Sequence, residues 1–436
     1  MATGNPSDSA PVKLTAIVGG GQAIGTLDTG KRVFVWGGLP EETVLFRVTQ
    51  KRSKLVEGIV TEVIQASSQR IDPVEPESYL STSPWQIMSF DAEMSYKSQL
   101  IMEAFQLHHV SLPGKTNTYT DGQQYGYRNK VEFSWWGDTD EAGNETLDLA
   151  FFVRGGKGKV PVQGTALARD EINQLARALR DILRTHHINA RTLKTLLIRC
   201  DQRGNCAWQL YVKDKEVLKT LSEIDFSSLP AQGGEVIYSD PKSPASRITE
   251  RISSYNNVVL SDTILDTPFH YATEGFFQVN IPVYEHVLRI MKQWVPEGQP
   301  SVDLYSGVGS IGLTIGGQST QLIEIDEHAV REMKRNIATL NSDAEAILSS
   351  SETAVSYITS DKTIIVDPPR AGLHTAVIDR ILEVTPQRIV YLSCNPVTQA
   401  RDVALLLEQY KIVFHEGYNF FPRTPHIEHL VVLNLM

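Results

Sequence analysis

Cys394 stands at the end of a short apolar segment, in a place where an α/β sheet could use it for chemistry. The segment is Ile389–Leu392, and Pro396 follows the cysteine closely. Four largely apolar residues ahead of a proline indicate a buried strand that stops there. The cysteine is therefore predicted at the carboxyl end of a strand, where open parallel sheets bind their ligands. A thiolate there could act as a nucleophile, whereas the alternative is a buried cysteine that only fills space.

Three more strand-like segments nearby end in residues suited to a ligand. The sequence Asp303–Gly312 is rich in glycine, which would let the backbone approach a ligand at the start of a helix. Glu324 ends the next segment, at about the distance at which an acid meets a ribose in nucleotide-binding folds. Asp367 opens D-P-P-R, whose prolines could form a stiff wall against a flat base. Alone, Glu324 could be a surface acid and Asp367 a helix cap, but their joint occurrence favours a ligand site.

Glu428 lies just ahead of the last apolar segment of the chain, in F-P-R-T-P-H-I-E. It would reach the same edge of the sheet if that last segment joined the sheet as a strand. Taken by itself, Glu428 is more simply interpreted as a surface acid.

The elements that must position these residues alternate between strand-like and helix-like patterns over residues 276–436. This alternation implies a mostly parallel sheet covered by helices on both faces. Two closing segments could add an antiparallel edge pair. The predicted strands are Ser301–Leu304, Gln321–Ile325, Thr363–Val366, Arg388–Leu392, Lys411–His415 and His429–Leu435.

Residues 11–66 read as short strands separated by glycine turns, which predicts a small barrel of the oligonucleotide-binding type. A basic cluster in this part could contact phosphate, or it could be a solvated loop face. The predicted strands are Val12–Ile17, Arg32–Trp36, Thr43–Thr49 and Gly58–Gln65, and the basic residues are Arg47, Lys51, Arg52 and Lys54.

Residues 90–270 are predicted to form a central α+β domain whose topology the sequence does not give. Asp170–Thr185 has the pattern of an amphipathic helix. Tyr127, Arg128 and Lys130 could stack on a base and hold phosphates, or the strand could turn its aromatic residues inward. Further predicted strands are Leu147–Val153, Thr195–Arg199 and Ala207–Val212.

The composition limits the class of protein. Three cysteines in 436 residues argue against a disulfide framework and fit the reducing cytoplasm. The polar start, Met1–Lys13, shows no secretory signal, and no apolar stretch is long enough to span a membrane. With a net charge of −10, the protein would have to hold nucleic acid through a local basic patch.

Five motifs in order make the chain resemble the RNA uracil-5-methyltransferase family, which uses S-adenosylmethionine. They are G-F-F-Q-V-N, D-L-Y-S-G-V-G-S-I-G-L, I-V-D-P-P-R-A-G-L, Y-L-S-C-N-P-V-T-Q-A-R-D and F-P-R-T-P-H-I-E. Near the amino terminus, G-Q-A-I-G-T-L-D followed by V-F-V-W-G-G-L-P-E-E resembles the TRAM domain of RNA-modifying enzymes. The resemblance implies a Rossmann-like methyltransferase domain that acts on carbon 5 of a uridine in structured RNA, either tRNA or rRNA. It also implies a monomer with no membrane partner.

The resemblance assigns roles to six residues. Cys394 would be the nucleophile and Glu428 the base. The residues that would hold S-adenosylmethionine are Gln278, Tyr305, Glu324 and Asp367. A reactive thiol needs a lowered pKa, for which Arg370 or Arg401 is the hypothesis.

The cysteines that ligate an iron–sulfur cluster in many members of this family are missing here. Many relatives carry cluster ligands near the central domain, but this chain has no cysteine before Cys200. Cys200 and Cys206 cannot complete a four-thiolate site, so no metal and no iron–sulfur cluster are predicted.

Cytosine-5 enzymes carry an additional cysteine where this chain has Arg370, which favours uracil. A catalytically silent RNA-binding protein is the other alternative, although Cys394 and Glu428 are both present.

Overall fold

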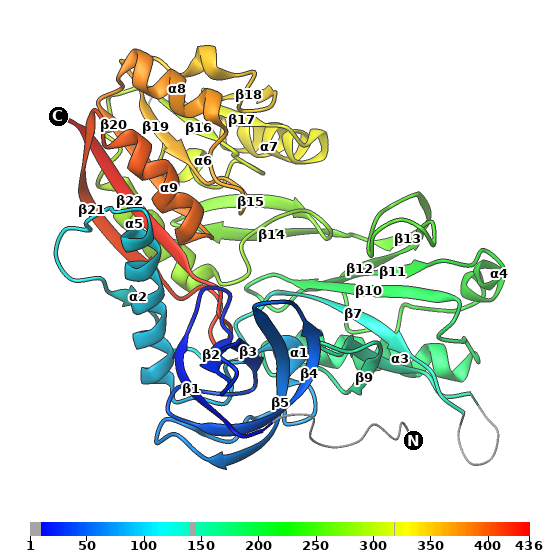
Figure 1. Ribbon diagram of the computed structural model, residues 1–436. Coiled ribbons are helices and arrows are strands. Elements are labelled where there is room, and N and C mark those ends of the chain that lie inside the picture. The colour runs from blue at the N-terminus through cyan, green and yellow to red at the C-terminus, as the bar shows by residue number, and fades with distance from the viewer. Residues whose placement is uncertain (1–9, 140–144, 318) are drawn as a thin grey trace.

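The computed structural model describes residues 10–139, 145–317 and 319–436. In Figure 1 a small barrel lies below, a sheet of the central part lies to the right, and the carboxyl-terminal sheet lies above. No helix within the described ranges is both long and apolar enough to cross a membrane.

Five strands close into the amino-terminal barrel in the order β1-β2-β3-β5-β4. Alternate side chains of these strands point inward, which is why the sequence shows a period of two. The sequence predicted four of the strands and missed the shortest one, β2. The strands are β1 (Val12–Ile17), β2 (Ala23–Thr26), β3 (Arg32–Trp36), β4 (Thr43–Lys51) and β5 (Leu55–Gln65).

A seven-stranded sheet forms the central part, in the order β13-β12-β11-β10-β7-β8-β9. Helix α3 (Asp170–Thr185) packs its apolar face on this sheet, where the helical spacing predicted it. A separate hairpin, β14 (Val259–Ile264) and β15 (Thr267–Ala272), leads from this sheet to the carboxyl-terminal part. The remaining elements are β7 (Lys130–Trp136), β8 (Asp148–Phe152), β9 (Lys159–Val162), β10 (Leu193–Cys200), β11 (Cys206–Val212), α4 (Val217–Ser222), β12 (Gly233–Tyr238) and β13 (Glu250–Asn256).

The carboxyl-terminal sheet has eight strands in the order β18-β17-β16-β19-β20-β22-β21-β6. Its first five strands are parallel, and β22 is antiparallel to both neighbours. The strands are β16 (Ser301–Leu304), β17 (Gln321–Glu324), β18 (Glu345–Leu348), β19 (Thr363–Val366), β20 (Arg388–Ser393), β21 (Tyr410–Tyr418) and β22 (Glu428–Leu435), with β6 (Thr118–Tyr119) beside β21. The mixed α/β fold predicted from the sequence, with its barrel and its carboxyl-terminal Rossmann-like domain, is therefore confirmed.

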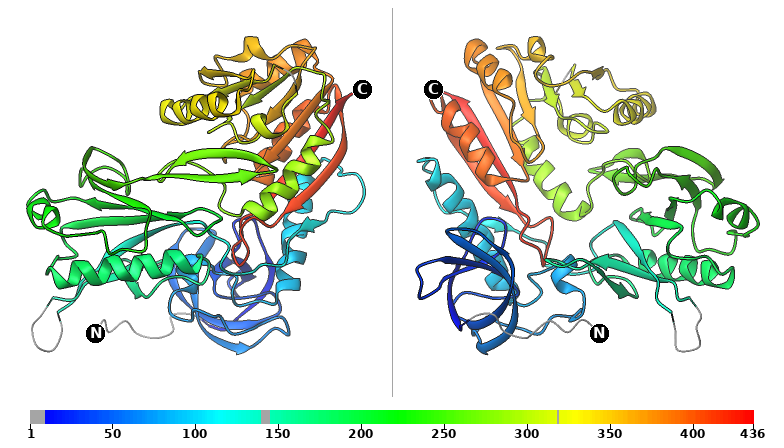
Figure 2. Two further views of the ribbon diagram at one scale, coloured as in Figure 1. Left: turned by 180° about the vertical axis from the view of Figure 1, so that it is seen from behind. Right: turned by 45° about the vertical axis from the view of Figure 1, so that its right-hand side comes forward.

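Helices cover both faces of this sheet, as the alternation predicted. On β19, Ile364 and Val366 pack in one core cluster with α2, α8 and α9, whereas Ile365 packs in another with α5 and α6. Figure 2 shows these helices on either side of the strands. The helices are α2 (Phe90–Leu107), α5 (Ile281–Lys292), α6 (Gly312–Ile315), α7 (Glu327–Leu340), α8 (Thr375–Val384) and α9 (Pro396–Leu406). The short helix η1 (Val355–Tyr357) lies beside α8, and α1 (Tyr79–Thr82) contacts β8.

Two elements within the predicted central range, 90–270, pack on the carboxyl-terminal sheet. Helix α2 contacts α9 and β21, and β6 pairs with β21 in parallel. The strands predicted as an edge pair, β21 and β22, therefore pair antiparallel but do not form the edge, because β6 covers β21. The domain boundaries stay a prediction, and residues 140–144 of the central range lie outside the described residues.

Candidate active site at the carboxyl ends of the parallel strands

Tyr305, Glu324 and Asp367 lie side by side at one edge of the sheet. Each directly follows or ends its strand, β16, β17 or β19. These strands pair in register up to their last residues, so the three residues stand in one row. The sheet thus brings together three residues that are spread over more than sixty positions of the chain, at the edge where parallel sheets place their ligands.

Cys394 and Glu428 face each other across neighbouring strands. Ser393 at the end of β20 pairs with His429 of β22, so the residues just beyond that pair, Cys394 and Glu428, are opposite one another. Cys394 is half-buried and lines a cavity, whereas Glu428 is 6% exposed. The sulfur is therefore reachable and beside a carboxyl group.

Burial dominates the acid–base properties of this pair. It raises the pKa of the Cys394 thiol to about 12, and the negative charges of Glu428 and Asp367 raise it further. Burial also raises the pKa of Glu428 well above its usual range, with Asp367 adding to the effect. Asp367 itself has a pKa raised by burial. Burial thus shifts all three groups toward their protonated forms.

A positive charge does act to lower the pKa of the Cys394 thiol, as expected, but burial raises this pKa by more. Arg370 acts in the predicted direction on both Cys394 and Glu428, but burial outweighs it. Arg401 donates instead to Asp402 and to the carbonyl of Ala371. The hypothesis that Arg401 activates the thiol is therefore wrong, because its guanidinium is committed elsewhere.

Backbone groups hold Glu324 in place. Its carboxylate accepts hydrogen bonds from the backbone N–H groups of Gly307 (2.9 Å), Ile325 (2.7 Å) and Asp326 (2.8 Å). It is thus a fixed acceptor tied to the glycine-rich turn and not a loose surface acid. Gly307 has φ +56° and leaves open space where a Cβ would stand, so the backbone is bare at this point.

Asp303 lies buried beneath the glycine-rich turn, and sequence reasoning missed it as a candidate site residue. Its Oδ2 accepts from the backbone N–H of Gly312 at 2.9 Å, and burial raises its pKa to about 8. Its Oδ1 has no hydrogen-bond partner among the described residues. The sequence D-L-Y-S-G shows an acid near the end of the β16 segment, just before the glycine-rich turn. That position could have marked Asp303 as a candidate.

Gln278 lies between β15 and α5, on a segment that the central part of the chain holds. The side chain of Asn129 donates to the carbonyl of Gln278 at 2.9 Å. Lys130 Nζ donates to the carbonyl of Glu274 at 2.7 Å, and Arg199 donates to that of Gly275 at 2.8 Å. The side chain of Gln278 is 8% exposed. The segment is therefore clamped through its backbone.

The side chains around Tyr127 mostly serve the same internal contacts. Tyr127 is buried and donates its hydroxyl hydrogen to the carbonyl of Pro422 at 3.0 Å. Burial lowers the pKa of Lys130 to about 7. Both residues face inward, so stacking on a base or binding phosphate is the wrong interpretation for them, whereas Arg128 stays half-buried beside Phe421.

A buried ion pair on α2 fixes the loop that precedes Glu428. The carboxylate of Glu93 accepts from the backbone N–H of Arg423 and from the side chain of Asn419, both at 3.0 Å. Lys97 Nζ lies 3.2 Å from Glu93 and donates to Asn419 at 2.6 Å. Sequence reasoning missed both residues, because their partners are more than 300 positions away.

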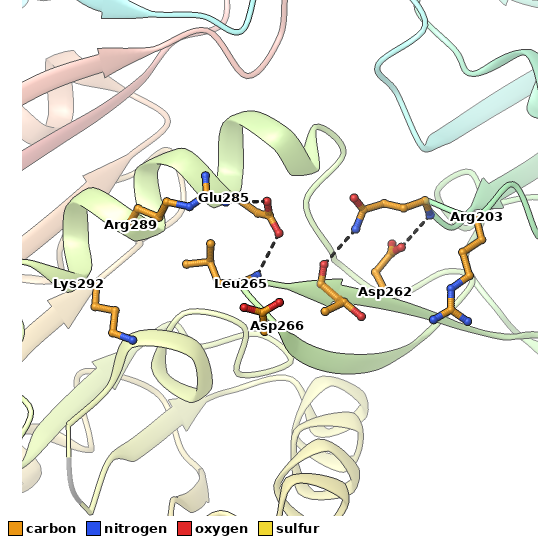
Figure 3. Close-up of a pocket in the computed structure, with 9 residues that line it drawn as sticks. Arg203, Asp262, Leu265, Asp266, Glu285, Arg289 and Lys292 are labelled. Atoms are coloured by element: carbon orange, nitrogen blue, oxygen red, sulfur yellow. Dashed lines mark hydrogen bonds and ion pairs between the residues drawn. The ribbon is translucent and has the colours of Figure 1, made fainter.

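A cavity of about 550 Å³ opens beside Cys394 and extends to the barrel. A second cavity, of about 580 Å³, lies at the turn between β14 and β15 and beside α5. Figure 3 shows this second cavity lined by charged side chains of both signs, among them Arg203, Asp266 and Lys292. It contains none of the predicted site residues. Within the described ranges, no three His, Cys, Asp or Glu side chains converge as a metal site would require.

Comparison with known proteins adds to this geometry. Residues 353–436 match the family model described as tRNA (Uracil-5-)-methyltransferase. An uncharacterized RNA methyltransferase of Nitratidesulfovibrio vulgaris is 27% identical, covering 97% of this chain and 95% of that protein. One of Nanoarchaeum equitans is 40% identical over 183 residues, which is 41% of this chain and 40% of that protein.

A solved structure agrees along nearly the whole chain. The Pyrococcus abyssi tRNA (uracil-54, C5)-methyltransferase, in complex with S-adenosyl-L-homocysteine, superposes with a TM-score of 0.78. It is 20% identical and covers 97% of this chain and 100% of its own, so the likeness shows the fold. The chain is thus similar to RNA methyltransferases, in fold to the Pyrococcus abyssi protein and in sequence to the relatives above. Its resemblance to the RNA uracil-5-methyltransferase family, predicted from the five motifs, is confirmed.

Proposed function

We propose that this protein transfers a methyl group from S-adenosylmethionine to carbon 5 of a uridine in structured RNA. The observation that carries the proposal is the register of β20 and β22, which sets the Cys394 thiol opposite the Glu428 carboxyl group. A thiol and a carboxyl group are the two groups that this reaction needs.

Tyr305, Glu324 and Asp367, the row at the strand ends, carry polar groups that suit S-adenosylmethionine. Glu324 is a fixed carboxylate beside the bare backbone of Gly307, which suits a ribose. Tyr305 accepts from Ser351 at 2.8 Å and lies at the same edge. Asp367 and the buried side chain of Gln278 complete the proposed set. When bound, S-adenosylmethionine supplies an electrophilic methyl group that an electron-rich carbon can take.

Cys394 and Glu428 would make that carbon reactive and then restore the ring. Carbon 5 of uracil is a weak nucleophile. Addition of the Cys394 thiolate to carbon 6 forms a sulfur–carbon bond and places the electron pair on carbon 5. After methylation, Glu428 takes the hydrogen of carbon 5 as a proton, and the sulfur–carbon bond breaks to release the thiolate. The target base must leave its stack to reach the sulfur.

The raised pKa values of Glu428 and Cys394 suit removal of the carbon 5 proton more than addition of the thiolate. A carboxyl group with a raised pKa is a stronger base once it is ionised, which helps Glu428 to take the proton. The thiol, in contrast, must lose its proton before it can add. Among the described residues, Arg370 is the positive charge that acts on both groups, and it favours the thiolate. We therefore assign Arg370 the role of promoting addition.

The substrate is proposed to be tRNA or rRNA, handled by a monomer in the cytoplasm without a metal or an iron–sulfur cluster. The Pyrococcus abyssi protein is described as acting on tRNA uracil-54, which makes a tRNA transcript the first substrate to test. Incubation of transcripts with labelled S-adenosylmethionine, followed by nucleoside analysis, should yield labelled 5-methyluridine.

Labelled 5-methylcytidine in that assay would favour the cytosine-5 alternative, and no label in any RNA would contradict the proposal. Comparison of 5-methyluridine in total RNA from cells with and without this protein would identify the position.

A further inference from the structure

The cavity beside Cys394 continues well past the sulfur to the amino-terminal barrel. Parts of the chain far apart in sequence line it. The lining includes Cys394 and Arg370 from the carboxyl-terminal part, Gly20 and Trp36 from the barrel, and Arg154 from the central part. Its volume of about 550 Å³ leaves room beyond a single pyrimidine ring. The cavity therefore has a second end that the proposed chemistry does not use.

Arg154 and Trp36 form a flat platform at that second end. The guanidinium carbon of Arg154 lies 4.2 Å from the centre of the Trp36 ring. Arg154 Nε donates to the carbonyl of Leu80. A side chain at Gly155 would come within 2.8 Å of Ile59 in β5, so this loop rests against the barrel. The guanidinium is consequently held in one orientation by packing and by a hydrogen bond.

The cavity is positive in an otherwise acidic protein. None of the described residues that line it is Asp or Glu, whereas the second cavity has three such residues. Within the described ranges no carboxylate pairs with Arg154 or Arg370 at ion-pair distance. Partial burial lowers the pKa of His426 in the lining, and the charges of Arg370, Lys97, Arg128 and Arg154 lower it further. Several cations thus act on one point of the cavity wall.

We propose that the barrel end of this cavity binds the nucleotide next to the target uridine, with its base stacked on the Arg154–Trp36 platform. The inference rests on the proposed function. Arginine planes and aromatic rings are surfaces on which unstacked RNA bases settle, and Arg370, which also lines the cavity, supplies a positive charge for a phosphate of the bound RNA. Arg154 and Trp36 are then positioning residues that hold the RNA while the target base meets Cys394.

The test uses short RNAs that carry 5-fluorouridine at the target, with S-adenosylmethionine, and measures the RNA concentration that gives half-maximal adduct formation. One RNA is intact, and two others lack the base on the 5′ or the 3′ side of the target. In the natural protein, removal of one of these bases should raise that concentration at least about fivefold, the lower range for loss of base stacking. No rise with either RNA would overturn the proposal without any variant.

Protein variants then locate the effect. In Arg154→Ala and Trp36→Ala, the intact RNA should already show the rise, and base removal should add less than about twofold. Arg154→Lys keeps the charge but loses the plane, so it should behave like Arg154→Ala toward base removal. Lys215→Ala, which removes a cation 4.6 Å from the Tyr238 ring on the central sheet, should behave like the natural protein.

Equal effects of base removal in Arg154→Lys and in the natural protein would contradict the platform. Thermal unfolding identifies a variant that fails to fold, and in that case Arg154→Lys and the natural protein still decide the question. Failure of the proposed function looks different, because the natural protein would then form no adduct with any of these RNAs.

Discussion

Cys394 and the pair Cys200–Cys206 are the same residue type in opposite surroundings. Cys200 and Cys206 are paired positions of β10 and β11, at 0% and 1% exposure, within the core of the central sheet. Cys394 lies just past the end of β20, half-buried, beside a cavity and facing Glu428. The two kinds of site differ in access and in neighbours.

The thiol pKa does not distinguish Cys394 from the buried pair, because it is raised in Cys394 and in Cys206. A hydrogen bond with Cys200, together with burial, raises the pKa of Cys206, and burial raises the pKa of Cys394 to about 12. A nearby cation does not distinguish them either, since Arg169 favours the Cys206 thiolate as Arg370 favours that of Cys394. The comparison teaches that the proposed nucleophile is distinguished by its place at a strand end beside a cavity, where a substrate can reach it.

The largest effect should come from Glu428→Gln. The amide cannot take the proton from carbon 5, so methyl transfer turnover should fall by about 10²- to 10⁴-fold. Addition of Cys394 should survive, and a covalent protein–RNA complex should accumulate on RNA with ordinary uridine. Denaturing gels would show the complex. Loss of turnover without any such complex would mean that Glu428 acts before addition or only supports the fold.

Adduct formation should speed up as the pH rises. A thiol with a raised pKa is mostly protonated near neutral pH, so its thiolate fraction grows about tenfold for each pH unit. The rate with 5-fluorouridine RNA should therefore rise between about pH 6.5 and about pH 8.5 while the protein stays folded. A rate that falls over this window would contradict the raised pKa of Cys394, since the ionised forms of both Cys394 and Glu428 increase with pH.

Arg370→Ala should slow addition about tenfold, because the thiolate loses a favourable charge whose removal is worth about one pKa unit. Binding of S-adenosylmethionine should persist, as measured by calorimetry. Arg401→Ala is the matched control, since its guanidinium binds Asp402 and the carbonyl of Ala371, and the charge that acts on the thiol is that of Arg370. Equal loss of binding and addition in Arg370→Ala would defeat the assigned role.

The smallest effect on activity should come from Cys206→Ala. Removal of a buried sulfur leaves a small cavity, so the free energy of unfolding should fall by about 1 kcal/mol. Urea denaturation measures the loss, and methyl transfer at a temperature where the variant is folded should match the natural protein. A large loss of activity without loss of stability would erase the distinction between the two kinds of cysteine.

The sequence predicted regular elements well where hydrophobic periodicity was strong. The bounds of β1, β16 and α3 follow from it directly. Strand β2 was missed because its sequence, A-I-G-T, has one large apolar residue and a glycine, and β6 because its partner β21 lies some 300 residues away. Pairing partners that distant leave no local trace in a single chain.

The site was predictable only in part for the same reason. Strand ends indicated a ligand edge, and Cys394 was visible there. Glu428 by itself read as a surface acid, because only the register of β20 and β22 brings it to the sulfur. The family resemblance supplied that pairing. The supports from Glu93 and Lys97 stayed hidden, since burial of charged residues on a helix is a tertiary effect.

The most direct test of the central claim is to map the covalent bond itself. RNA with 5-fluorouridine at the target, incubated with the protein and S-adenosylmethionine, should leave a denaturation-resistant adduct, because fluorine cannot leave carbon 5 as a proton does. Digestion and mass spectrometry should find the nucleotide on the peptide that contains Cys394, and Cys394→Ala should form none. An adduct on Cys200 or Cys206, or an undiminished adduct in Cys394→Ala, would contradict the account.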